Sequence, residues 1–134
     1  MQKIIVLIFI ALVAYLLMVT TTPSGDATLL NNRAFKLSEE GKYDEALKLY
    51  ERALMKERQN ITGHLPDMAI IYNNMGFLYE SKKDYHNALL QHKKAQKIRF
   101  DNLGKGNIYT IESAENIKRV NKLLEINRMK FRRE

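Results

Sequence analysis

The sequence contains no cysteine. This absence excludes disulfide bonds, thiolate nucleophiles, cysteine-based zinc sites and lipoprotein acylation. It does not decide the compartment, because a cysteine-free domain can lie on either side of a membrane. Familiar catalytic motifs are also missing: there is no Ser-His-Asp arrangement, no phosphate-binding glycine loop and no HExxH. We therefore expect no catalytic residues and no cofactor.

The three histidines do not predict a metal site. His64 is expected in a loop, whereas His86 and His92 fall on one predicted helix, six residues apart. Residues at that spacing do not share a helix face, so the pair cannot hold one ion. We expect His92 to occupy an aromatic packing position instead.

Positive charge is in excess, with 22 Lys and Arg against 15 Asp and Glu, a net charge of +7. The excess is concentrated at the end of the chain, because residues 118–134 include seven basic and two acidic side chains. Such an end can attract an acidic partner, anionic lipid or nucleic acid. It is also typical of a solvated helix face with a basic tip, which we favour, and nucleic acid is not expected as a partner.

The first 22 residues differ from the rest, because no charged residue occurs between Ile4 and Thr22. As a helix, this run would rise about 28 Å at about 1.5 Å per residue, close to the bilayer core of about 30 Å. It therefore predicts a single transmembrane helix at 1–22, followed by a linker at 23–26.

A cleaved signal peptide is the alternative, and it would leave a secreted soluble domain. Small residues around Asp26 offer a cleavage site, but it lies well beyond the apolar run, and Pro23 intervenes. The basic start at Lys3 favours a cytoplasmic N-terminus and an extracytoplasmic (periplasmic or luminal) domain. Basic residues that follow the run leave a cytoplasmic domain as another possibility.

The chain repeats itself at an offset of 42 residues. Seven positions are identical across this offset, and Ala34 returns as the similarly small Gly76. Internal repeats of this length, with helical spacing inside them, are typical of stacked helix pairs. The identical pairs are Asn31/Asn73, Asn32/Asn74, Phe35/Phe77, Tyr43/Tyr85, Ala46/Ala88, Leu47/Leu89 and Ala53/Ala95.

Apolar periodicity predicts an all-α protein with five helices after the linker, at about 27–39, 43–59, 67–81, 85–100 and 108–132. We expect Asp26 to cap the first helix and Gly41 to end it in a left-handed conformation. Loops are expected at 60–66 and 102–107. The last helix should turn an apolar stripe inward and cap the stack. That predicted stripe is Ile111, Ala114, Ile117, Val120 and Leu124.

The motif Tyr72-x-x-Met75-Gly76-x-x-Tyr79, followed by Ala88 and Ala95, resembles the tetratricopeptide repeat family. The long period resembles the variant found in kinesin light chains and many bacterial proteins. The resemblance spans about 27–122 and implies a right-handed α-α superhelix. Its departures are Arg33 at a usually apolar position, His92 at an aromatic one, and no proline closing either repeat. The implied units are repeats at 27–62 and 68–104, within 27–107, and a capping helix with a basic end at 108–134.

In this family the first helix of each pair lines a concave groove, which implies a binding site for a protein or peptide. An asparagine side chain can donate and accept, so a row of them can pair with an extended backbone. The same amides can instead fix the register between helices, or do both. Arg119 and Lys122 are expected to meet an acidic side chain or a carboxylate. The predicted groove residues are Asn31, Asn32, Phe35, Asn73, Asn74, Phe77, Asn116, Arg119 and Lys122.

These features predict a membrane-anchored adaptor that holds a partner segment in its groove. One alternative is an assembly subunit of a membrane complex that docks through its convex face and cap helix. Others are a secreted soluble repeat protein and a basic-tail binder of anionic lipid. The sequence does not indicate whether the chain forms homo-oligomers.

Overall fold

The computed structural model describes residues 10–13, 25–59 and 65–132. Within these ranges every regular element is a helix, as predicted, and residues 10–13 are helical. The five longer helices are α2 (Gly25–Glu39), α3 (Tyr43–Gln59), α4 (Leu65–Ser81), α5 (Tyr85–Leu103) and α6 (Ile108–Phe131).

The predicted transmembrane run lies outside the described residues, apart from 10–13. Across the described ranges, the structure contains no helix with both the length and the apolar character needed to cross a bilayer. The membrane anchor therefore stays a prediction from the sequence.

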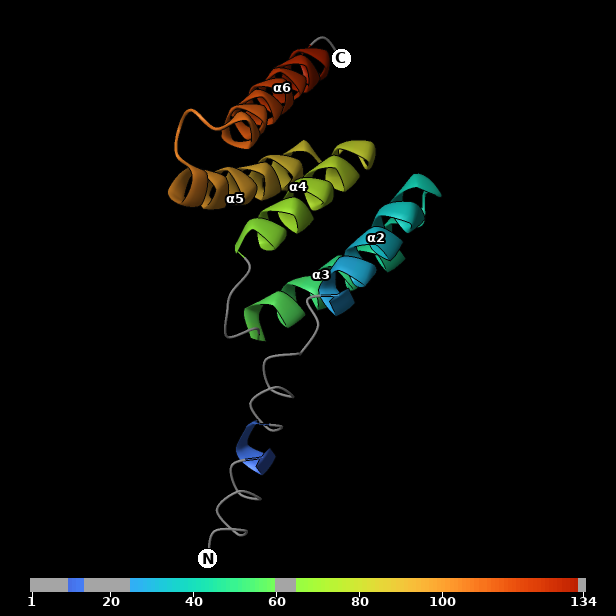
Figure 1. Cartoon of the computed structure of the whole chain (residues 1–134). Coiled ribbons are helices and arrows are strands. Elements are labelled where there is room, and N and C mark those ends of the chain that lie inside the picture. The colour runs from blue at the N-terminus through green and yellow to red at the C-terminus, as the bar shows by residue number, and fades with distance from the viewer. Residues whose placement is uncertain (1–9, 14–24, 60–64, 133–134) are drawn as a thin grey trace, which may run out of the picture.

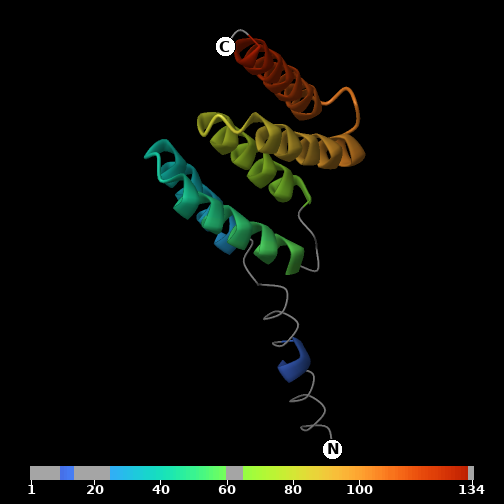
Figure 2. The same cartoon turned by 180° about the vertical axis from the view of Figure 1, so that it is seen from behind.

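The chain folds into two helix hairpins and a single last helix. The hairpins pair α2 with α3 and α4 with α5, α4 packs on the first hairpin, and α6 packs on α5. Figure 1 shows this order as a stack rising from α2 and α3 to α6, and Figure 2 shows the same succession from behind. This arrangement fits the predicted superhelix of two repeats and a terminal helix.

Both hairpins turn in the same way. Gly41 has φ 77°, and the N–H of Lys42 bonds back to the Leu37 carbonyl at 2.9 Å. At the equivalent turn Lys83 has φ 58°, and the N–H of Asp84 bonds to the Tyr79 carbonyl at 2.9 Å. The left-handed residue satisfies carbonyls at the helix end in both cases. The prediction for Gly41 is confirmed, and Lys83 adopts the same conformation despite its side chain.

Small residues allow the helices of each hairpin to approach closely. Ala34 and Ala46 are fully buried in the first hairpin, and Ala88 and Ala95 are fully buried in the second. A Cβ atom at Gly76 would lie only 2.5 Å from the His92 ring, so the ring packs directly on this glycine. The small residues that repeat in the sequence are therefore the points where helices cross.

Most predicted core positions are confirmed. Tyr50, Ile71 and Leu78 are at most 2% exposed, and the other inward residues of α3 and α4 contact the same core. Helix α4 buries residues on two sides because it packs on α5 and on the first hairpin. This explains why its sequence shows a broader apolar face than the other helices do.

Three predicted boundaries were wrong by a few residues. Helix α2 begins at Gly25, so Asp26 lies in its first turn instead of capping it and pairs with Lys56 at 2.7 Å. Helix α4 begins at Leu65 and includes Pro66, because proline fits a first helical turn where its missing N–H has no intrahelical partner. Helix α5 continues to Leu103, where the sequence predicted a loop.

The prediction for the inward face of α6 was wrong for Ile111 and Ala114, whereas Val120 is buried as predicted and Ile117 and Leu124 are half-buried. Ile111 is 43% exposed and Ala114 is exposed, whereas Thr110, Ser113 and Asn116 are buried together with Val120. Buried Arg99 of α5 explains the polar face, because it donates to Ser113 Oγ at 2.8 Å and to the Tyr109 carbonyl at 3.1 Å. Hydrogen bonds therefore contribute to the docking of α6 beside the apolar packing of Val120.

Candidate functional site

The predicted groove residues fall into an exposed set and a buried set. Phe35 is 46% exposed and Phe77 is 36% exposed, and Asn32 is exposed as well. In contrast, Asn31 and Asn73 are 8% and 7% exposed. The exposed residues can contact another molecule, and the buried ones hold the helices together.

A continuous row of uncharged side chains follows the exposed face of α2 and α4. Its members stand at i, i+4 and i+7 on each helix, and the two sets are offset by 42 residues. At one end of the row, Thr28, Asn32 and Ile70 line one cavity of about 150 Å³. We call this row the uncharged strip: Thr28, Asn32, Phe35, Ile70, Asn74 and Phe77.

Buried and half-buried amides bond from one repeat to the next. Asn74 Nδ2 donates to Asn31 Oδ1 at 3.0 Å, and Asn116 Nδ2 donates to Asn73 Oδ1 at 3.0 Å. Both bonds join residues 43 apart, so the same contact recurs between successive repeats. The register role that the sequence predicted for these asparagines is therefore present in the structure.

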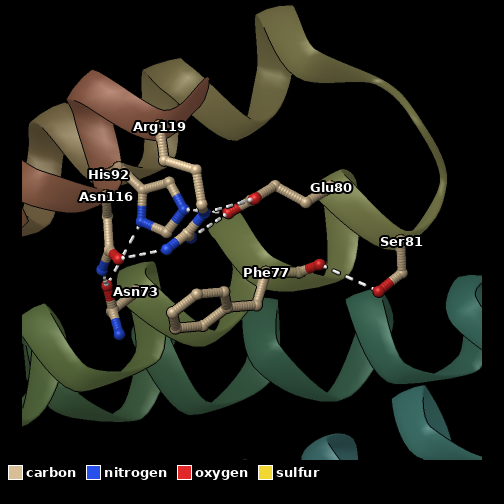
Figure 3. Close-up of polar contacts among 7 residues, drawn as sticks. All are labelled: Asn73, Phe77, Glu80, Ser81, His92, Asn116 and Arg119. Carbon is tan, nitrogen blue, oxygen red and sulfur yellow. Dashed lines mark hydrogen bonds and ion pairs between the residues drawn. The ribbon is translucent and has the colours of Figure 1, made fainter. Parts of the chain in front are cut away.

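Five side chains from α4, α5 and α6 form a closed circuit of polar contacts, which Figure 3 shows. Its members are Asn73, Glu80, His92, Asn116 and Arg119, and we call it the polar ring. His92 Nδ1 lies 3.2 Å from Asn73 Oδ1, and His92 Nε2 lies 2.8 Å from Glu80 Oε1.

Arg119 closes the polar ring from α6. Its Nε and one terminal nitrogen donate to the two carboxylate oxygens of Glu80 at 3.1 and 2.8 Å, and the other terminal nitrogen donates to Asn116 Oδ1 at 2.9 Å. The guanidinium also lies 5.3 Å from the centre of the Phe77 ring. Arg119 therefore pairs with an acidic side chain of its own chain, and its predicted contact with an acidic group of a partner stays a prediction. Lys122 is exposed one turn further along α6.

The neighbours of Glu80 favour its ionised form. Burial alone would raise the pKa of this carboxyl, but hydrogen bonds from His92 and Arg119 outweigh burial and hold the pKa below its ordinary value. Glu80 therefore carries a negative charge at neutral pH, and the positive charge of Arg119 balances it.

His92 occupies the buried aromatic position that the sequence predicted. Its ring meets the Phe77 ring edge to face, with centres 5.1 Å apart and planes at 75°. The equivalent residue of the first repeat is Tyr50, whose hydroxyl is buried and has no hydrogen-bond partner among the described residues. Burial raises the pKa of this hydroxyl. Histidine therefore gives the second repeat two polar contacts that the first repeat lacks.

Sequence reasoning missed Glu80 and the polar role of His92. Both positions break the internal repeat, because Ser38 and Tyr50 stand at the equivalent places in the first copy. That departure was the available signal. It was not sufficient, because only the packing of α6 brings Arg119 to Glu80.

The tetratricopeptide repeat profile matches residues 25–99, more than half of the chain. The chain belongs to the tetratricopeptide repeat family. The family match covers both helix hairpins, in agreement with the resemblance carried by Tyr72, Gly76 and Tyr79. No significant match was found among curated proteins.

Tetratricopeptide repeats are typically interaction modules rather than catalysts, and the site has the features of a binding surface. Among the residues that the structure describes, no group of three or more His, Asp or Glu side chains is placed to hold a metal ion. The strip offers amide groups and aromatic rings, which suit contact with a peptide backbone and apolar side chains.

Proposed function

We propose that this protein is a membrane-anchored adaptor whose uncharged strip holds an extended segment of a partner protein. The observation that carries the proposal is the exposure of Phe35 and Phe77 at equivalent positions of neighbouring repeats. Two large aromatic rings on the same face of a small domain are typical of a binding surface.

The strip suits an extended chain because its two kinds of group complement a peptide. Exposed Asn32 and half-buried Asn74 offer amides to backbone N–H and C=O groups, which every sequence carries. Phe35 and Phe77 offer apolar area to side chains. Two repeats make a short surface, so affinity for an isolated segment should be modest, and tethering of both partners to one membrane would raise the effective concentration.

The anchor in this proposal is the apolar run from Ile4 to Thr22. Its length and lack of charge support insertion as an uncleaved signal anchor, and Lys3 supports an extracytoplasmic domain. Two measurements test this part. The mass of the mature protein detects cleavage, and digestion of intact and opened membrane vesicles by an added protease reveals which side carries the domain.

A crosslinking experiment in membranes tests the groove. The full chain is captured after crosslinking, and the attached proteins are identified. The double variant Phe35→Ala/Phe77→Ala should lose the partner. Met55→Ala is the control, because Met55 is 54% exposed on α3, whereas the strip lies on α2 and α4. Equal capture by all three proteins, with helix content unchanged, would contradict the proposed groove.

A second candidate function is an assembly subunit that docks through α6. The supporting observation is the outward side of this helix, where Ile111 and Ala114, together with Phe100 of α5, line a cavity of about 370 Å³. Ile111→Glu should abolish assembly by a subunit of this kind, and the strip variants should not affect it. The reverse pattern supports the adaptor.

A further inference from the structure

We propose that Glu80 sets the charge selectivity of the groove, so that it accepts uncharged apolar segments and rejects acidic ones. The inference rests on the proposed groove function and specifies the partner class. It concerns a residue that lies just beyond the strip and bonds to Arg119, whose guanidinium lies 5.3 Å from the centre of the Phe77 ring.

The strip is uncharged on a molecule in which 28% of the residues are charged. Charged side chains of α2 such as Arg33 and Lys36 follow members of the strip in the sequence, but they stand at other angles around the helix. A partner segment on α2 and α4 therefore meets amides, a hydroxyl and apolar groups. Acidic side chains of the partner would lose water there without gaining an opposite charge.

Arg119 is the residue that an acidic segment would seek, but three of its five N–H donors are already engaged. Three of its nitrogens donate to Glu80 and Asn116, at distances between 2.8 and 3.1 Å. Bidentate pairing between a guanidinium and a carboxylate is strong and geometrically specific. An incoming carboxylate would find only the two remaining N–H groups of Arg119, whose charge Glu80 already balances, and Glu80 would repel it.

Glu80 is held firmly enough to keep this role. Its side chain is 15% exposed, and His92, which is fully buried, contacts the same carboxylate at 2.8 Å. The lowered pKa keeps Glu80 ionised at neutral pH. At the other end of the strip, the carboxylate of Asp67 lines the cavity next to Asn32, so that end also repels an acidic segment.

A selection experiment tests the inference. A library of random linear peptides displayed on phage is selected on the full chain, in detergent, and in parallel on Glu80→Gln. The glutamine keeps the size of the side chain and an acceptor for Arg119, but it removes the charge. We expect wild-type binders rich in aromatic and branched apolar residues. Binders of Glu80→Gln should contain Asp and Glu about tenfold more often than binders of the wild type. This factor corresponds to the free energy of one partly exposed hydrogen bond between charged groups.

The double variant Glu80→Gln/Arg119→Gln provides the control. Acidic enrichment should disappear there, because the cation that Glu80→Gln released is gone. A measurement on the wild type alone adds a test that does not depend on the folding of a variant. The affinity of the wild type for the peptides selected on it should change less than about twofold between low and high salt, because salt screens interactions between charges.

The outcomes separate this inference from the groove itself. Acidic binders of the wild type, identical selections on the two proteins, or a steep loss of affinity with salt would overturn the role of Glu80. The groove would still stand if Phe35→Ala/Phe77→Ala abolished those binders. If none of the selected binders depended on these two rings, that result would contradict the groove, and the inference with it.

Discussion

Replacement of Gly76 by alanine tests the packing on which the second repeat depends. A Cβ atom at this position would lie 2.5 Å from His92 Cε1 and 2.7 Å from each ring nitrogen. Such separations are far inside ordinary contact, so either the ring or α4 must shift. The ring is not free to move, because it is fully buried and contacts Asn73 and Glu80.

The magnitude follows from three contributions to the free energy of unfolding. An extra methyl group in a filled core costs about 1–3 kcal/mol, and loss of a buried hydrogen bond of His92 costs about 1–3 kcal/mol. The higher helix propensity of alanine than of glycine stabilises the folded state by about 1 kcal/mol. We expect Gly76→Ala to lower stability by about 2 kcal/mol, which corresponds to a fall in Tm of about 10 °C.

Thermal unfolding of the full chain, followed by far-UV circular dichroism, measures this change. Gly106→Ala is the control, because a Cβ atom at Gly106 meets nothing within 4 Å, and its effect should stay within about 0.5 kcal/mol. In the double variant Gly76→Ala/His92→Ala the two changes should cost about 1 kcal/mol less than their sum. A Gly76→Ala protein as stable as the wild type, or strictly additive changes, would refute the reasoning.

Three further predictions concern charge and backbone conformation. Because the pKa of Glu80 is lowered on folding, its stabilisation is present above the ordinary carboxyl pKa and is lost as pH falls through the folded-state value. Glu80→Gln should therefore cost about 1 kcal/mol at neutral pH and little in acid, as denaturant midpoints against pH will show; a constant difference would contradict this. Arg99→Ala should cost about 2 kcal/mol and speed amide exchange in α6, whereas exposed Lys97→Ala should cost less than about 0.5 kcal/mol; equal effects would rule out the docking role of Arg99. Lys83→Gly should raise stability by about 0.5–1 kcal/mol, since it relieves a left-handed residue; unchanged thermal unfolding would argue against strain at that turn.

Much of the fold could be predicted because each repeat carries local signals. Gly41 marks the turn between α2 and α3, and the spacing of small and apolar residues marks where helices cross. Boundaries were less certain, because Pro66 suits either a loop or a first helical turn. Neighbouring structure decides between the two.

The first part of the inward face of α6, at Ile111 and Ala114, was predicted wrongly for a physical reason. Hydrophobic periodicity assumes that the apolar stripe points inward, but Arg99 on α5 requires acceptors, and α6 supplies them from Ser113 and the Tyr109 carbonyl. The candidate site was predicted in part for a similar reason. Phe35 and Phe77 were identified by their repetition, whereas Glu80 carried no local signal of its partner.

The sequence by itself determined that the chain is helical, that it repeats and which family it belongs to, because these properties arise from spacing within one hairpin. Only the tertiary structure decided that Asn73 is buried, that Arg119 is paired and that Ile111 faces outward. These outcomes depend on which side chains from different helices meet. The packing of α6 on the second repeat determines these contacts. They join residues far apart in the sequence, whereas periodicity describes only neighbours within one helix.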